Sequence, residues 1–177
     1  MQIRTAEPAD AEALAALGER LWRGTYEGLL PQDNLELHLA ATFGPAQQAR
    51  ELADPASRTL VLEQDGQLLG YALLVPRAPE AVAASFQVVK PLEVARFYLD
   101  PTLHGTGAAR SLMEAVLDQA RAAGHEAVWL QVWEQNPRAI RFYLKAGFQD
   151  AGEAFYRIGE QVDRDRLMVH LLMTRQV

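Results

Sequence analysis

The sequence of 177 residues contains no cysteine. This absence excludes disulfide bonds, zinc sites with cysteine ligands and catalysis by a thiolate. No apolar run approaches the roughly 18 to 20 residues that a membrane-spanning helix needs. The opening residues MQIRTAEPAD also lack the basic and then apolar pattern of a secretion signal. We therefore expect a cytoplasmic protein without a membrane partner.

Positive charge is also scarce. The chain has 17 Lys and Arg against 23 Asp and Glu, a formal net charge of −6 at pH 7. No cluster of basic residues is flanked by aromatic residues that would stack on bases, so nucleic acid is not an expected partner. His38, His125 and His170 are scattered without the spacing of metal ligands, so we expect no metal.

The residues that are present indicate one globular domain over residues 1–177. Hydrophobic residues make up 49% of the chain and charged residues 23%, enough for a sizeable core. The patterns predict strand, helices, hairpin, strand, helix, strand, helix and two closing strands, which is a mixed α/β sheet with helices on both faces. The predicted strands are a short one within residues 2–10 that runs into a turn, the hairpin 58–75 around Asp65-Gly66, 92–99, 127–133, 148–158 and 166–174. The predicted helices are 10–22 with Asp10 as N-cap, 32–43, a segment ending before Pro55, one after the glycine-rich turn that Gly124 ends, and one that starts at Pro137 after the N-cap Asn136 and is closed by Gly147. Residues 76–91 are expected to form a loop.

A glycine-rich turn, GTGAA at 105–109, joins the strand at 92–99 to an amphipathic helix. The N-terminus of a helix presents unpaired N–H groups and a partial positive charge, which suits a phosphate. The small residues of the turn let a phosphate approach the backbone, although such turns also serve as plain tight connections. No lysine follows as in a P-loop, and the turn lies too late in the chain for a dinucleotide fingerprint.

Two motifs stand out. The first is the turn His104-Gly105-Thr106-Gly107-Ala108-Ala109 after Leu99-Asp100-Pro101, and the second combines Asn136, Tyr143, Gly147 and Phe148. Together they resemble the motifs of the GCN5-related N-acetyltransferase (GNAT) superfamily. The resemblance implies a mixed, mostly antiparallel sheet of six to seven strands with helices on both faces. It also implies acetyl-CoA as co-substrate, with its pyrophosphate on the turn.

The resemblance assigns the residues of the acetyl-CoA site. The main chain of Phe97, Tyr98 and Leu99 would hold the pantetheine arm and the thioester, and Asn136 would add a contact. His104 stands where the family has Gln or Arg, and Arg110 would supply positive charge instead. Tyr143 would be the general acid that protonates the CoA thiolate, whereas its helical stripe alone favours a half-buried core residue.

A general base is needed because an amine reaches the enzyme protonated. The strand position where N-terminal acetyltransferases of ribosomal proteins carry Glu is Gln131 here, which cannot accept a proton. Glu93 and Glu134 are the candidates, and each is equally a candidate for an ordinary surface charge. We favour Glu93.

The acceptor is expected to be the primary amine of a small molecule. LWRGTYEGLLP and the stretch around Asn136 resemble bacterial polyamine N-acetyltransferases. Trp22, Tyr26 and Trp133, with Glu134, would line the acceptor side, where aromatic rings attract a cation, although aromatic residues at such places are usually core. The alternatives are acetylation of a protein N-terminus or lysine, and a non-catalytic acyl-CoA-binding module. The resemblance also allows a homodimer.

Overall fold

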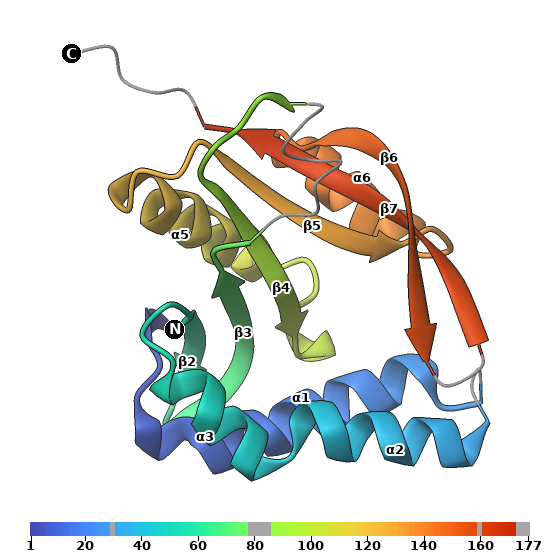
Figure 1. Cartoon of the computed structure of the whole chain (residues 1–177). Coiled ribbons are helices and arrows are strands. Elements are labelled where there is room, and N and C mark those ends of the chain that lie inside the picture. The colour runs from blue at the N-terminus through green and yellow to red at the C-terminus, as the bar shows by residue number, and fades with distance from the viewer. Residues whose placement is uncertain (29–30, 78–85, 159–160, 173–177) are drawn as a thin grey trace. The chain divides into compact units, whose positions relative to one another are not determined.

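The computed structural model of the chain describes residues 1–28, 31–77, 86–158 and 161–172 (Figure 1). The chain divides into two compact units. The first combines Met1–Leu73 with Arg96–Leu112, and the second combines Leu74–Ala95 with Met113–Val177. A single domain over the whole chain therefore stays a prediction, and each unit is described separately below.

The strands form a seven-stranded sheet in the order β1-β2-β3-β4-β5-β7-β6. They are β1 (Gln2–Thr5), β2 (Arg58–Gln64), β3 (Gln67–Val75), β4 (Pro91–Leu99), β5 (Ala127–Trp133), β6 (Gln149–Ile158) and β7 (Gln161–Leu171). The pairs β1–β2, β5–β7 and β6–β7 are antiparallel, while β4 and β5 are parallel. The predicted mixed, mostly antiparallel α/β sheet is confirmed.

Three helices belong to the first unit, where they lie side by side: α1 (Ala11–Tyr26), α2 (Gln32–Phe43) and α3 (Pro45–Ala53) (Figure 1). Leu14 and Leu17 of α1 form a buried cluster with Val61 of β2 and Tyr71 of β3. The apolar spacing of α1 places these leucines on one face, and burying that face stabilises the helix more than its intrinsic propensity does.

Two sequence predictions in the first unit have different outcomes. The β2–β3 hairpin turns at Asp65-Gly66 as predicted, and both residues have positive φ (52° and 76°). Asp10 stands at the N-cap position of α1, but its side chain does not cap the helix. Its carboxylate instead accepts two hydrogen bonds from Arg4, at 2.7 and 2.9 Å, and one from the Glu7 N–H at 2.7 Å.

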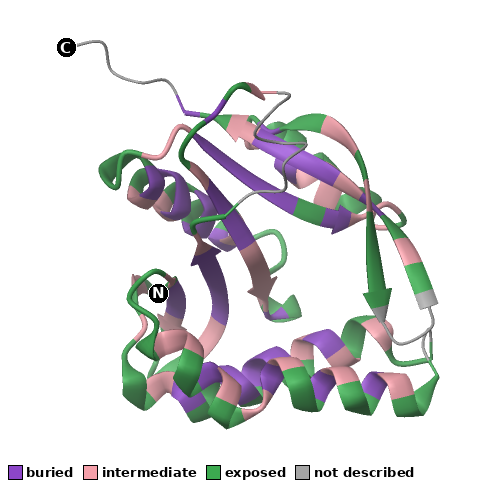
Figure 2. Ribbon diagram, in the orientation of Figure 1, coloured by how far each residue is buried: buried purple, intermediate pink, exposed green. Residues whose placement is uncertain are grey.

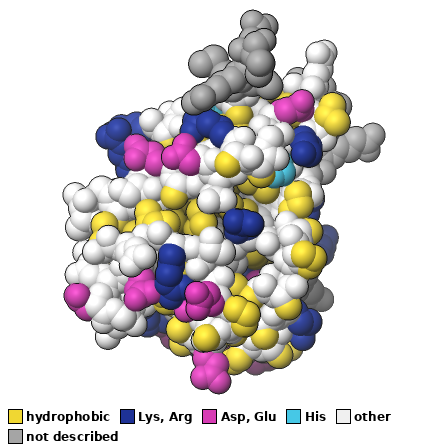
Figure 3. All heavy atoms as spheres, turned by 90° about the vertical axis from the view of Figure 1, so that its left-hand side faces the viewer, with side chains coloured by type: hydrophobic (Ala, Val, Ile, Leu, Met, Phe, Trp, Pro, Cys, Tyr) yellow, Lys and Arg dark blue, Asp and Glu magenta, His cyan; other side chains and the backbone are white. Residues whose placement is uncertain are grey.

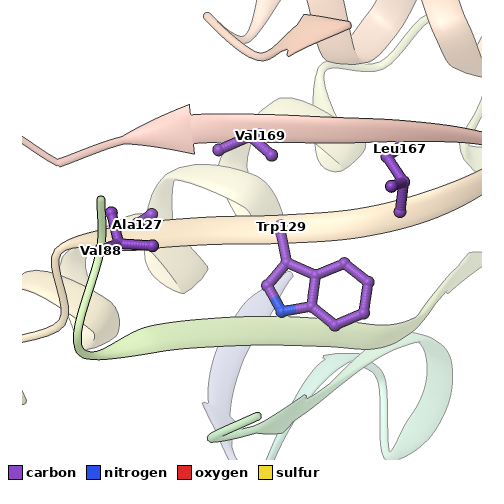
Figure 4. Close-up of a cluster of buried hydrophobic side chains, with 5 residues drawn as sticks. All are labelled: Val88, Ala127, Trp129, Leu167 and Val169. Atoms are coloured by element: carbon purple, nitrogen blue, oxygen red, sulfur yellow. The ribbon is translucent and has the colours of Figure 1, made fainter. Parts of the chain in front are cut away.

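The second unit is built around β5, which is largely buried in Figure 2. Ala127 and Trp129 of β5 pack with Leu167 and Val169 of β7 and with Val88 (Figure 4). Helix α6 (Pro137–Lys145) packs on the other face of β7, since His170 Nδ1 lies 3.1 Å from the Ala146 carbonyl oxygen. The predicted stripe of α5 (Ala108–Ala122) is buried at Met113, Val116, Leu117 and Ala120.

The closing strand differs from its prediction. It begins at Gln161, five residues earlier than expected, because Arg164 and Arg166 form ion pairs with acidic residues that neighbour them. Part of the predicted loop at 76–91 and the end of the last predicted strand lie outside the described residues. None of the described helices combines the length and the apolar composition of a membrane span.

Candidate functional site

The glycine turn of the first unit exposes backbone donors. Gly105 and Gly107 have φ of 77° and 86°, values that glycine adopts without strain. Thr106 closes the turn, because its hydroxyl donates to the Leu103 carbonyl at 2.8 Å and accepts from the Ala108 N–H at 3.3 Å. Within the described part of the chain, the N–H groups of Gly105, Gly107 and Ala109 have no acceptor. This set of free donors at the start of α5 fits an anion such as a phosphate.

Asp100 braces the turn from the strand side. It follows β4, and its carboxylate accepts from the Thr102 hydroxyl at 2.7 Å and from the Thr102 N–H at 2.9 Å. The Arg20 guanidinium donates to the other oxygen at 2.5 Å. These bonds, the Thr102 hydroxyl first, lower the pKa of Asp100 to about 2. The short 3₁₀ turn Pro101–Leu103 is thereby fixed between β4 and the glycines.

The predicted pantetheine strand lies immediately before this brace. Phe97, Tyr98 and Leu99 are all half-buried. The Tyr98 ring packs against Tyr71 and Phe43, with centroids 5.7 and 6.1 Å apart, so its side chain belongs to the core of the first unit. On β3, a Cβ at Gly70 would lie 3.0 Å from the Tyr98 carbonyl oxygen, which explains the glycine there.

The aromatic residues predicted for the acceptor side form a stack in the first unit. Trp22 is buried, and its ring lies 4.2 Å from His38 and 4.3 Å from the half-buried Tyr26, between centroids. Burial lowers the pKa of His38, with a smaller contribution from Arg96. The stack therefore holds a neutral imidazole at neutral pH.

The second unit carries the predicted general acid on α6. Asn136 caps this helix as predicted, since its side-chain oxygen accepts from the Ala139 N–H at 3.1 Å. Tyr143 is buried beside Phe142 and Phe148, and burial raises the pKa of its phenol. The phenol thus keeps its proton at neutral pH, as a general acid must.

The two candidate bases lie in different surroundings. Glu93 of β4 is 9% exposed and forms an ion pair with the largely exposed Arg77. Its β5 partner Trp129 donates its indole N–H to the Arg77 carbonyl at 2.5 Å. Glu134, which follows β5, is paired with Arg164 at 2.6 Å. Glu93 is the more buried carboxylate, and Glu134 is a half-buried surface residue.

The predicted site residues fall into two groups. The glycine turn and Phe97–Leu99 lie in the first unit, and Asn136 and Tyr143 lie in the second. His104 and Arg110 lie exposed at the turn, and Trp133 ends β5 directly before Glu134. Sequence reasoning missed Arg20 and Arg77, for which the sequence carries no signal. It also missed Asp165, a buried aspartate on β7. Alternation of acidic and basic residues at 163–166 was the available clue to a strand with one acidic face.

Surface charge on the face shown in Figure 3 is mixed. Lys and Arg side chains lie between Asp and Glu side chains, and among the described residues on that face they form no large patch of one sign.

Comparison with known proteins adds to this geometry. The sequence model of the acetyltransferase (GNAT) family matches residues 19–148. An uncharacterized N-acetyltransferase of Mycobacterium tuberculosis is 34% identical over 164 residues, which cover 93% of this chain and 99% of the relative. The streptothricin acetyltransferase of Streptomyces lavendulae is 29% identical over 165 residues, covering 85% and 82% of the two chains.

Solved structures share the fold. The PaiA N-acetyltransferase of Thermoplasma acidophilum, solved in complex with coenzyme A, matches with a TM-score of 0.76 at 20% identity, covering 97% of this chain and 98% of that one. At this identity the likeness concerns the fold.

Proposed function

Because the chain belongs to the acetyltransferase (GNAT) family, we propose that it transfers the acetyl group of acetyl-CoA to a primary amine of a small molecule. The observation that carries this proposal is the set of free N–H groups at Gly105, Gly107 and Ala109. They match the pyrophosphate of acetyl-CoA, and the main chain of Phe97–Leu99 leads away from them along β4. Polyamines are among the expected acceptors, and the streptothricin acetyltransferase shows that a relative acts on a small molecule.

The reaction is a direct transfer within a ternary complex. The neutral amine attacks the thioester carbonyl carbon, the new C–N bond forms, and the C–S bond breaks as the thiolate leaves. Glu93, directly or through water, takes a proton from the ammonium group of the acceptor before the attack. Tyr143 donates its proton to the leaving thiolate, and the proton that the nitrogen loses as the amide forms returns to the Tyr143 phenolate. Backbone N–H groups hold the oxyanion, and no acetyl-enzyme forms.

Burial of the two groups supports these roles. The raised pKa of Tyr143 keeps the donor protonated until the thiolate appears. The ion pair with Arg77 fixes the position of the Glu93 carboxylate on β4. Gln131, the alternative position on β5, has an amide that cannot accept one.

An acceptor panel tests the function. Purified protein is incubated with acetyl-CoA and spermidine, spermine, arylalkylamines, aminoglycosides, amino acids or short peptides, and free CoA is measured. We expect CoA release that depends on a small amine and falls at least about tenfold in Tyr143→Phe, because the leaving thiolate loses its proton donor. Tyr156→Phe, the same change at an exposed position of β6, is the matched control.

Each other result has a distinct meaning. Turnover with peptides alone would identify a protein acetyltransferase. Tight binding of acetyl-CoA without any turnover would support a non-catalytic module. A Tyr143→Phe rate equal to that of the wild type would remove the role given to Tyr143. The homodimer and the cytoplasmic location stay predictions.

A further inference from the structure

Asp165 lies in a row of side chains across three strands of the second unit. It stands directly opposite Trp133 of β5 and opposite Ala154 of β6. Residues that face each other in antiparallel strands point to the same side of the sheet. This side is opposite to the one that α6 covers, because His170, which contacts Ala146, is an odd number of residues away on β7.

Asp165 is a residue of low exposure whose carboxylate has no partner among the described residues. The residue is 8% exposed, and within the described part of the chain it forms no hydrogen bond or ion pair. Burying an ionised carboxylate is costly unless a cation or a set of donors accompanies it. Such a group is expected to have a functional reason, and a ligand that brings a positive charge would provide the missing partner.

The neighbouring arginines serve the other face. Arg164 and Arg166 alternate with Asp165 along β7, so they point to the opposite side. There Arg166 pairs with Asp150 at 2.7 Å, and Arg164 pairs with Glu134 at 2.6 Å. The chain thus supplies cations to the acidic residues on one side of β7 and withholds them from Asp165 on the other.

Trp133 gives the row a second feature that fits a cation. It is half-buried and ends β5 beside Asp165 on the same face. An indole ring attracts an ammonium group through cation–π interaction, and this attraction adds to that of a carboxylate. A carboxylate and an indole side by side on one sheet face are the elements of an ammonium-binding site.

We propose that Asp165 and Trp133 bind a cationic group of the acceptor that does not react, so that the enzyme selects amines with a second positive charge. This inference rests on the proposed function, and it names the class of acceptor. The pKa of Asp165 agrees with this geometry, because burial together with Asp163 and Glu134 raises it to about 6. Asp165 is still mainly ionised at pH 7.

The register places this site at a distance from the proposed base. Glu93 pairs with Trp129 in the parallel β4–β5 ladder, so it lies on the same face as Trp133 and Asp165. Four residues along β5 and two strand spacings separate it from Asp165, about 16 Å between Cα atoms at ordinary strand dimensions. A long diamine fits this separation better than a short one.

A matched pair of amines tests the proposal. Octamethylenediamine and octylamine have the same eight-carbon chain and differ in the second ammonium group. Their dissociation constants are measured by calorimetry on the full chain in the presence of CoA, and KM and kcat are measured with acetyl-CoA. We expect the diamine to bind about tenfold more tightly than the monoamine, and Asp165→Asn to abolish this difference by weakening the diamine alone, with kcat for the diamine nearly unchanged.

Glu153→Gln is the matched control, since it removes one carboxylate from the arginine side of the same sheet. It should leave both amines unaffected. Equal binding of the two amines to the wild type, or an equal loss for both in Asp165→Asn, would overturn the proposal. If the wild type acetylates no amine, the proposed function fails, yet the calorimetric comparison still decides whether Asp165 binds a cation.

Discussion

Asp100 in the first unit and Asp165 in the second are almost equally buried, with 6% and 8% of their surface exposed, yet their pKa values move in opposite directions. The Thr102 hydroxyl, the Thr102 N–H and Arg20 lower that of Asp100 to about 2. Burial without a partner, with Asp163 and Glu134 nearby, raises that of Asp165 to about 6.

The difference shows that partners, and not burial alone, decide what a buried carboxylate does. Both carboxylate oxygens of Asp100 accept hydrogen bonds from Thr102 or Arg20, so Asp100 stabilises the turn before α5 and has little acceptor capacity for a ligand. Asp165 is held by its strand and retains its full capacity. In the first unit the groups left free are donors instead of acceptors, namely the backbone N–H groups of Gly105, Gly107 and Ala109.

The largest effect is expected from Asp100→Ala. Loss of the bonds to Thr102 and Arg20 should lower the free energy of unfolding at pH 7 by about 2 kcal/mol, measured by urea denaturation. The folded-state pKa lies below the unfolded value, so the contribution of Asp100 is present above about pH 4 and is lost as the pH falls toward 2. Asp118→Ala, at a highly exposed side chain, should change stability by less than about 0.5 kcal/mol. Equal effects of the two changes would contradict the bracing role.

A smaller effect of opposite sign is expected from Asp165→Asn. The amide removes an unpartnered buried charge, so the free energy of unfolding should rise by about 1 kcal/mol at pH 8. The folded-state pKa lies above the unfolded value, so the wild type carries the penalty above about pH 6 and loses it as the pH falls toward 4. Unfolding curves of both proteins at pH 8 and pH 4 should therefore converge at the lower pH. A destabilised Asp165→Asn protein at pH 8 would show that the carboxylate has a stabilising partner after all.

A change in stability of similar size, and one that separates stability from binding, is expected from two glycines at opposite ends of α5. Gly107→Ala and Gly124→Ala each place a Cβ at positive φ, 86° and 72°, and should each cost about 1 kcal/mol. Only Gly107→Ala should raise the KM for acetyl-CoA, because only this residue lies in the turn with free donors. Steady-state kinetics at saturating acceptor measures this, and equal KM values would argue against the turn as the pyrophosphate site.

Much of the fold could be predicted because its signals are local. Asp65-Gly66 marked the hairpin, Asn136 and Pro137 marked the start of α6, and the apolar spacing of α5 marked its buried stripe. Each depends on residues a few positions apart, where turn chemistry and helical period act directly. The glycine turn belongs to the same class.

The remainder depends on contacts between distant residues. The residues next to Asp10 in the sequence do not indicate that its carboxylate would accept hydrogen bonds from Arg4 instead of capping the helix. The early start of β7 depends on cross-strand pairs with β6. Arg77 finds Glu93 sixteen residues away, across a segment predicted only as a loop. The candidate site could thus be predicted where the family motif names its residues, while the buried charge on β7 required the strand register.

The alternation of acids and arginines along β7 also protects that register during folding. A slip of one residue against β6 would place Glu153 opposite Asp165 or Leu167 and Asp150 opposite Leu167 or Val169, and would take both acids out of the row of Arg166. A pairing that is shifted by one residue therefore loses these ion pairs and places acidic side chains opposite apolar or acidic ones. The same four charges that leave Asp165 without a cationic partner therefore help to fix the register of the strand that carries it.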